Sequence, residues 1–161
     1  MNCNMRTIAG AAAVFVLFGA GLVGASEQQP AQVLFVCERG NVKSLMAASY
    51  FNQLAKERGL PFRGVARGLA PDSTTVPQSI ATALNAEGFD VSDFRPIAVS
   101  AADLSDSERI VLISTKLPTA ANLAPSKLEQ WDDVPPASTN YAAARDSLRS
   151  HVREIIERLA R

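Results

Sequence analysis

The sequence predicts an α/β protein with a parallel, doubly wound sheet. Short apolar runs, typical of strands buried on both faces, alternate along the chain with longer segments whose apolar residues recur at helical spacing. Glycine and proline lie at most of the changes between the two patterns. This alternation predicts parallel strands joined by helical crossovers, in a single domain without internal repeats.

The first strand and the first helix have the clearest patterns. Residues 32–37 form a continuous apolar run after Pro30, and from Ser44 the pattern is helical until Gly59 ends it. The apolar stripe of this helix is Leu45, Ala48, Phe51 and Ala55. We therefore expect a strand, a short turn and a helix at the start of the domain.

A second strand and a second helix follow. Residues 62–66 predict the strand, which Gly68 closes. The helix begins at Thr75-Val76-Pro77, with proline in its first turn, and Gly88 caps its end. Its apolar stripe is Val76, Ile80, Ala83 and Leu84.

Two further strands and a long helix complete the domain. Residues 110–113 are the best remaining strand, and residues 127–131 predict a short fourth. The last helix extends from about residue 140 to residue 159, with an apolar stripe of Leu148, Val152, Ile155, Ile156 and Leu159.

Residues 1–25 predict a secretory signal that precedes the domain. Arg6 comes before an apolar run of small residues at 8–25, after which the composition turns abruptly polar. We expect cleavage after Ala25 and a domain of residues 26–161 in the bacterial periplasm. Because the run is also just long enough to span a bilayer, an uncleaved anchor in the inner membrane is the alternative, and only then is a membrane a partner.

Charge and cysteine content narrow the expected function. The 161 residues include 16 Lys and Arg and 16 Asp and Glu, so nucleic acid is not an expected partner. Of the two cysteines, Cys3 lies in the signal, which leaves Cys37 without an internal disulfide partner. His151 is the only histidine, and no metal site or other cofactor is predicted. The sequence leaves the oligomeric state open.

The turn before the first helix carries the strongest chemical signal. It reads Cys37-Glu38-Arg39-Gly40-Asn41-Val42-Lys43-Ser44. A loop that enters a helix at the carboxyl end of a parallel strand directs free backbone N–H groups at one point, where an oxyanion can bind. Gly40 permits the positive φ of an anion-binding nest, and Lys43 adds a positive charge. Such a setting favours the thiolate of Cys37, a nucleophile for phosphorus.

With these motifs the chain resembles the low-molecular-weight phosphotyrosine phosphatases and the arsenate reductases of the same fold. The similarity extends from residue 32 to the C-terminus and rests mainly on the strand-Cys-loop-Ser-helix opening. Weaker matches are Ala66-Arg67-Gly68, Pro77, Gly88-Phe89-Asp90-Val91, Asp103-Leu104 and Trp131-Asp132-Asp133. The resemblance implies a four-stranded parallel sheet with helices on both faces. It also implies that Cys37 is the nucleophile and that Ser44 hydrogen-bonds its thiolate.

The loop departs from the family pattern at two places. Lys43 stands where the family has arginine. The planar guanidinium group of arginine can donate hydrogen bonds to two phosphate oxygens at once, whereas the ammonium group of lysine is a point charge. Gly40 and Asn41 each lie one residue later than the family's glycine and asparagine. Because Gly40 can still adopt the required backbone conformation, we expect the anion nest to form.

The expected general acid and the rim of the pocket also differ from the family pattern. Where the family has an Asp-Pro pair that protonates the leaving oxygen, this chain has Pro135-Pro136. Asp133 is the preferred candidate for the acid and Asp132 the second, although either could be a turn residue. Residues 67–73 and 132–138 contain none of the aromatic rings that flank the family's pocket.

Three functions remain open. The preferred one is hydrolysis of a small phosphate ester through a cysteinyl-phosphate intermediate. Lys43 and the displaced acid favour a non-catalytic module that binds a free oxyanion such as phosphate or arsenate. A thiol-dependent arsenate reductase is the third, although an exported protein would seldom meet the reducing thiol that it needs.

Overall fold

A four-stranded parallel sheet organises the part of the chain that the structure describes. The structure is a computed structural model, and it describes residues 29–118 and 122–161. The strands are β1 (Ala31–Cys37), β2 (Phe62–Gly68), β3 (Ser107–Ile113) and β4 (Leu128–Trp131), in the spatial order β2-β1-β3-β4. Every neighbouring pair is parallel, which confirms the predicted fold class.

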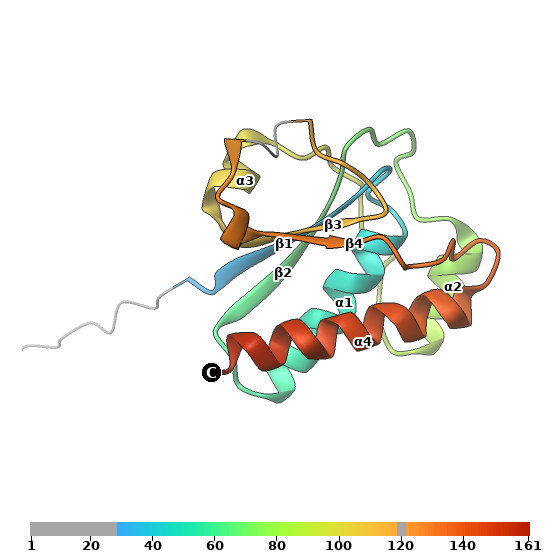
Figure 1. The fold of residues 1–161 in the computed structure, drawn as a ribbon. Coiled ribbons are helices and arrows are strands. Elements are labelled where there is room, and N and C mark those ends of the chain that lie inside the picture. Colours follow the sequence, from blue (N-terminus) through green and yellow to red (C-terminus); the bar gives the residue numbers. More distant parts are fainter. Residues whose placement is uncertain (1–28, 119–121) are drawn as a thin grey trace, which may run out of the picture.

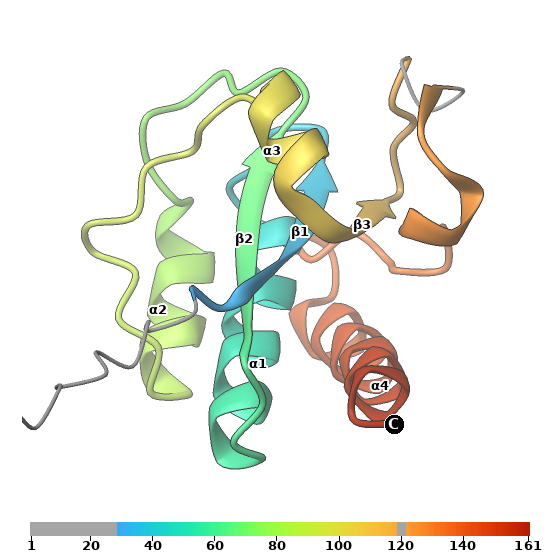
Figure 2. The same cartoon turned by 90° about the vertical axis from the view of Figure 1, so that its left-hand side faces the viewer.

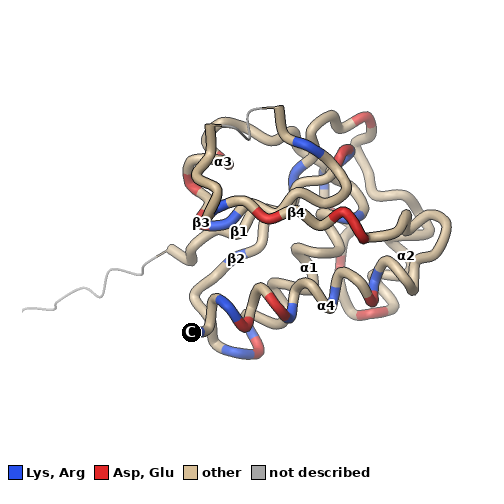
Figure 3. Tube along the Cα trace, in the orientation of Figure 1, with Lys and Arg blue, Asp and Glu red and all other residues tan. Residues whose placement is uncertain are grey.

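Helices cover both faces of the sheet (Figures 1 and 2). On one face lie α1 (Lys43–Glu57), α2 (Gln78–Ala86) and the long α4 (Tyr141–Leu159), and on the other lies the short α3 (Ala101–Asp106). A short 3-10 turn, η2 (Pro125–Lys127), precedes β4. Acidic and basic residues are interspersed along α4 (Figure 3), so this helix presents no single sign of charge.

The residues of β1 contribute to two cores, which explains its continuous apolar run. Val33 and Phe35 pack in the larger core, beneath α1 and α4, whereas Leu34 and Val36 pack in a smaller core on the α3 side. Successive side chains of a strand point to opposite faces, so a strand covered on both faces needs apolar residues throughout.

The predicted helix ends are mostly confirmed, with one difference. Gly59 and Gly88 have positive φ values of 63° and 91° just after α1 and α2. However, α2 begins at Gln78 rather than at Thr75, because Pro77 has an extended ψ of 134° and acts as the N-cap. The carbonyl oxygen of Pro77 accepts the first helical hydrogen bonds, from the N–H groups of Ile80 and Ala81.

One helix, α3, was not predicted from the sequence. It has six residues and buries none of them, so it has no apolar periodicity to detect. A capping box marks its start: Ser100 Oγ accepts from the Asp103 N–H, and the Asp103 side chain accepts from the Ser100 N–H. The Ser100-to-Asp103 spacing is the signal that could have revealed it.

The predicted signal segment, with its expected cleavage after Ala25, lies outside the described residues. Within the described residues, no helix is both long and apolar enough to cross a bilayer.

Candidate active site

The thiol of Cys37 lies at the carboxyl end of the central strand β1, enclosed by the turn that follows. The side chain is buried, and its Sγ receives a hydrogen bond from the Gly40 N–H at 3.3 Å. The hydroxyl of Ser44, which is fully buried in the first turn of α1, lies 3.2 Å from the same sulfur. A backbone N–H, a hydroxyl and a helix N-terminus thus surround this sulfur, an arrangement that stabilises negative charge.

The turn packs closely against the end of β2, where the backbone at Gly40 approaches the backbone at Gly68. Gly40 has a φ of 74°, and a Cβ added there would lie 2.6 Å from the Gly68 nitrogen. A Cβ at Gly68 would lie 2.7 Å from the Arg39 carbonyl carbon. The Leu69 N–H also donates to the Cys37 oxygen at 3.0 Å. Both glycines are needed for the backbones to meet, a role of Gly68 that the sequence did not reveal.

Lys43 connects the turn to two other strand ends. Its Nζ donates to Ser114 Oγ at 2.8 Å and to the Val134 carbonyl oxygen at 2.7 Å. Burial lowers the pKa of Lys43 below its ordinary value, and the nearby Cys37 opposes this effect. Ser114 has a φ of 50°, in the left-handed region that non-glycine residues seldom occupy. Such backbone strain is common at functional sites.

The other residues of the turn have partners of different kinds. Glu38 is exposed, and its Oε2 accepts a hydrogen bond from Thr115 Oγ1 at 3.2 Å. Arg39 forms an ion pair with Asp72. Asn41 is buried and donates from its side-chain amide to the Thr75 oxygen at 3.4 Å. These three residues therefore hold the turn to two separate segments, the one after β3 and the loop between β2 and α2.

A cavity of about 260 Å³ opens above the thiol. Its floor is formed by the turn, with Cys37, Asn41, Val42 and Lys43 among the lining residues. The rim away from the turn is small and mostly apolar. It consists of Pro77, Ser79, Ile80, Pro136, Ala137 and Ser138. No aromatic ring is among the described residues that line this cavity, as the sequence led us to expect.

Neither predicted acid, Asp132 or Asp133, lines this cavity. Asp132 Oδ1 accepts from the Gln130 side chain at 2.7 Å. Asp133 Oδ1 lies 2.7 Å from His151 Nε2 on α4, and this hydrogen bond lowers the pKa of the Asp133 carboxyl. The structure thus brings together residues 37–44 but not the two aspartates.

Ser114 and Thr115 are site residues that sequence reasoning missed. They follow β3, which neighbours β1 in the sheet, so their side chains meet the turn at the same edge. Their place after a buried strand was the available signal, because ligands of open α/β sheets bind where strands end.

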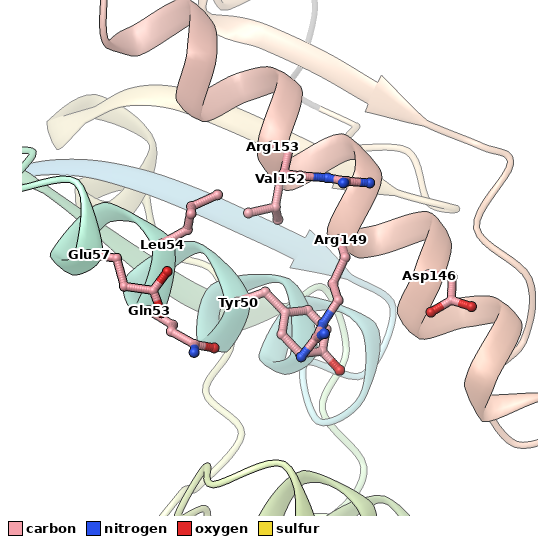
Figure 4. A pocket seen from close by; sticks show the side chains of 8 residues that line it. All are labelled: Tyr50, Gln53, Leu54, Glu57, Asp146, Arg149, Val152 and Arg153. Carbon is pink, nitrogen blue, oxygen red and sulfur yellow. The ribbon is translucent and has the colours of Figure 1, made fainter.

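A second cavity, of about 380 Å³, lies between α1 and α4 (Figure 4) and shares no residue with the first. Arg149 lies 4.8 Å above the ring of Tyr50, and the Glu87 carboxylate joins Tyr50, Tyr141 and Arg149 by hydrogen bonds. These contacts hold α1 and α4 together. Nowhere in the described part of the chain do three or more His, Cys, Asp or Glu side chains lie together so that they could share a metal ion.

One family of known proteins matches this chain. The family described as low molecular weight phosphotyrosine protein phosphatase matches residues 32–134. No curated protein is similar enough to match.

Solved structures share the fold at low sequence identity. YfkJ from Bacillus subtilis has a TM-score of 0.70 at 18% identity, over 83% of this chain and 97% of that chain. The low molecular weight protein tyrosine phosphatase from T. tengcongensis has 0.69 at 22%, over 80% and 99%. An arsenate reductase from Archaeoglobus fulgidus has 0.61 at 22%, over 78% and 98%. These similarities show a common fold.

Proposed function

Because the chain belongs to the low molecular weight phosphotyrosine protein phosphatase family, we propose that it hydrolyses phosphate monoesters through a cysteinyl-phosphate intermediate. The observation that carries the proposal is the setting of the Cys37 thiol. Its sulfur accepts a hydrogen bond from the Gly40 N–H, has Ser44 Oγ 3.2 Å away, and lines an open cavity. These contacts favour a thiolate where a phosphoryl group can approach.

In the proposed reaction the turn binds and the thiolate attacks. Backbone N–H groups of residues 38–44 and the dipole of α1 bind the phosphate oxygens, and the Lys43 ammonium adds charge. Cys37 Sγ attacks phosphorus as the bond to the leaving oxygen breaks. Water then cleaves the sulfur–phosphorus bond and regenerates the thiolate. Ser44 stabilises the thiolate as nucleophile in the first step and as leaving group in the second.

Turnover of p-nitrophenyl phosphate by the purified protein tests the proposal, with Cys37→Ser as the matched control. We expect turnover in the wild type, its loss in the variant, and a phosphorylated Cys37 after rapid acid quenching. Turnover that survives in Cys37→Ser would contradict the proposal, since the proposed intermediate could not form.

Binding of an oxyanion without turnover is the second candidate function. Two observations favour it: the Lys43 ammonium is already engaged by Ser114 and Val134, and neither Asp132 nor Asp133 lines the cavity. This function predicts that phosphate or arsenate protects Cys37 from alkylation while no phosphate ester is hydrolysed. Arsenite formation from arsenate in the presence of a thiol would instead support the arsenate-reductase alternative.

The N-terminal sequence is the basis for a further proposal, that the protein acts in the periplasm. Cell fractionation followed by N-terminal sequencing tests it. A periplasmic form that begins at Ser26 is expected, whereas an intact N-terminus in the membrane fraction would support the uncleaved anchor.

A further inference from the structure

The cavity above the thiol is bordered by one carboxyl group among the described residues, that of Glu38. Of the other described residues that line the cavity, none is a histidine, and Arg39 and Lys43 are cationic side chains that donate hydrogen bonds. The remaining polar side chains are serine hydroxyls and the amide of Asn41, which seldom act as general bases. Apart from the nucleophile Cys37, Glu38 is thus the described lining residue suited to take a proton from water.

The carboxylate of Glu38 is fixed at one oxygen and can bind a second partner at the other. Its Oε2 accepts a hydrogen bond from Thr115 Oγ1 at 3.2 Å. A carboxylate accepts hydrogen bonds through both oxygens, so Oε1 can still bind a water molecule in the cavity. The contact with Thr115 uses Glu38 as an acceptor, which is also the role of a general base.

Thr115 is itself held by the sheet. It is buried just after β3, and its main-chain oxygen accepts from Gln130 Nε2 on β4 at 2.9 Å. A β-branched side chain has few rotamers, and burial restricts them further. The hydroxyl of Thr115 therefore gives the exposed carboxylate of Glu38 a partner whose position is set by packing.

Glu38 lies on the side of the cavity from which water enters. Cys37 is buried at the floor of the cavity, whereas its neighbour Glu38 is exposed and lines the same cavity. In phosphoryl transfer the attacking and leaving atoms lie roughly in line with phosphorus. Water that attacks a phosphoryl group on Cys37 Sγ must therefore come from the open side, opposite the sulfur. An exposed carboxylate at the edge of the cavity borders this path.

The two aspartates that the sequence suggested as acids are held outside the cavity. Asp133 is bonded to His151, whose ring is stacked on Trp131 with 4.7 Å between ring centroids. Asp132 accepts from the side chain of Gln130 at 2.7 Å. Neither aspartate lines the cavity, so the turn after β1, and not the segment after β4, brings a carboxylate to it.

We propose that Glu38 is the general base of the second step, in which the cysteinyl phosphate is hydrolysed. The oxygen of a water molecule forms a bond to phosphorus while one of its protons passes to Glu38 Oε1. The sulfur–phosphorus bond breaks, and Cys37 Sγ leaves with the bonding electrons as the thiolate. The hydrogen phosphate product keeps the other water proton, and Glu38 then releases its proton to solvent. Thr115 is a positioning residue, which acts through Glu38. This inference rests on the proposed function, since it requires a phosphorylated Cys37.

Rapid-mixing kinetics with p-nitrophenyl phosphate separate the two steps. Release of p-nitrophenolate, a good leaving group, reports phosphorylation of Cys37, and the steady-state rate then reports hydrolysis of the intermediate. In Glu38→Gln we expect an unchanged rate of phosphorylation and hydrolysis at least about a hundredfold slower than in the wild type. The variant should therefore show a burst of p-nitrophenolate and accumulate phosphorylated Cys37. The glutamine amide oxygen can still accept from Thr115, so this contact of the turn can persist. Glu57→Gln, the same change at an exposed residue of α1 in the other cavity, is the matched control.

The possible outcomes distinguish the inference from the proposed function. Equal rates of hydrolysis in the phosphorylated wild type and in Glu38→Gln would overturn the inference and leave the proposed function intact. A defect of Glu38→Gln confined to phosphorylation would also overturn it, because Glu38 would then act on substrate binding or on the first step. If the intermediate accumulated in Asp132→Asn or Asp133→Asn instead, that aspartate would be the base. If Cys37 is phosphorylated neither in the wild type nor in Glu38→Gln, both the inference and the proposed function are wrong.

Thr115→Val tests the positioning role. The change removes the hydroxyl and nearly preserves the shape of the side chain. We expect hydrolysis of the intermediate to slow about tenfold, as for the loss of a hydrogen bond to a charged group, while phosphorylation keeps its rate. An equal slowing of both steps would show a structural role only, and hydrolysis at the wild-type rate would show that Thr115 does not direct Glu38.

Discussion

Lys43 Nζ donates a hydrogen bond to the main-chain oxygen of Val134, 2.7 Å away. This bond joins the first residue of α1 to the segment after β4, and a second bond from the same ammonium reaches Ser114 after β3. One side chain thus connects the ends of three strands around the thiol. Lys43 therefore has a structural role in addition to any charge that it offers to an oxyanion.

Replacing Lys43 should affect binding and stability together. Lys43→Ala should weaken phosphate or vanadate binding by about 1.5–3 kcal/mol, the usual value of a charged hydrogen bond. Lys43→Arg should bind phosphate or vanadate at least as tightly as the wild type, because the guanidinium group can donate to two oxygens at once. Titration calorimetry measures the affinity, and chemical denaturation measures the accompanying loss of stability. Equal affinity in the wild type and Lys43→Ala would mean that Lys43 is only a structural link.

Ser44→Ala should slow the chemistry of Cys37. The buried Ser44 hydroxyl lies 3.2 Å from the sulfur, and a hydrogen bond to a charged group contributes about 1.5–3 kcal/mol. The rate of iodoacetamide alkylation at neutral pH should therefore fall about tenfold or more. Ser105→Ala, which removes an exposed hydroxyl on α3, is the control. Equal alkylation rates in the two variants would show that Ser44 does not stabilise the thiolate.

Gly68→Ala should disrupt the oxyanion site. The added Cβ would lie 2.7 Å from the Arg39 carbonyl carbon and 2.8 Å from the Gly40 nitrogen, so the turn must move. Overpacking of this kind costs about 1–3 kcal/mol, and phosphate should no longer protect Cys37 from alkylation. Gly59→Ala is the control, because a Cβ at Gly59 would have nothing within 4 Å and would strain only the local backbone, whose φ is 63°. The Gly59→Ala variant should be less stable than the wild type, but phosphate should still protect its Cys37 from alkylation.

Acid should weaken the link between β2 and α3. Burial alone would raise the pKa of the Asp103 carboxyl, but hydrogen bonds from Ser100 and Arg67 outweigh it and lower the pKa. The ionised carboxylate therefore stabilises the fold above the unfolded pKa of about 3.9. That stabilisation is lost as the pH falls through the lower, folded value. Asp103→Asn should be less stable than the wild type by about 1.5–3 kcal/mol at pH 7.

Denaturation curves of the wild type and Asp103→Asn between pH 7 and strongly acidic solution check this prediction. The difference between the two proteins should shrink below about pH 4. A difference that stays constant over the whole range would show that the charge of Asp103 contributes nothing.

A phosphotyrosine peptide should have little advantage over a small aryl phosphate. The described residues that line the thiol cavity include no aromatic ring to stack on the tyrosine side chain, so the aryl group gains little binding energy from them. Values of kcat/KM for the peptide and for phenyl phosphate provide the comparison. A preference of about a hundredfold for the peptide, or about 2.7 kcal/mol, would show that other residues supply aromatic contacts, with Tyr141 the nearest candidate.

The sequence predicted the fold well where an element has a clear apolar pattern. The continuous apolar run of β1 and the apolar stripe of α4 (Leu148, Val152, Ile155 and Ile156) are local patterns, and each is present in the structure as predicted. The helix α3 is too short to have such a pattern. At the site, residues 37–44 could be named together because a single turn keeps neighbours in sequence close in space.

The sequence by itself determined the order of the strands and of the helices α1, α2 and α4, and the turn that surrounds Cys37, because these depend on residues a few positions apart. Only the tertiary structure decided the partners of Lys43 and Asp133. Lys43 meets Val134 and Ser114 because the order β1-β3-β4 brings three strand ends together. Asp133 turns to His151 because α4 packs beside β4 and offers its ring nitrogen there. A carboxylate that follows a strand can face either the thiol or a neighbouring helix. Its direction depends on the nearest hydrogen-bond donor, and here that donor is a residue of α4, which is distant in sequence and comes close only when the helix packs.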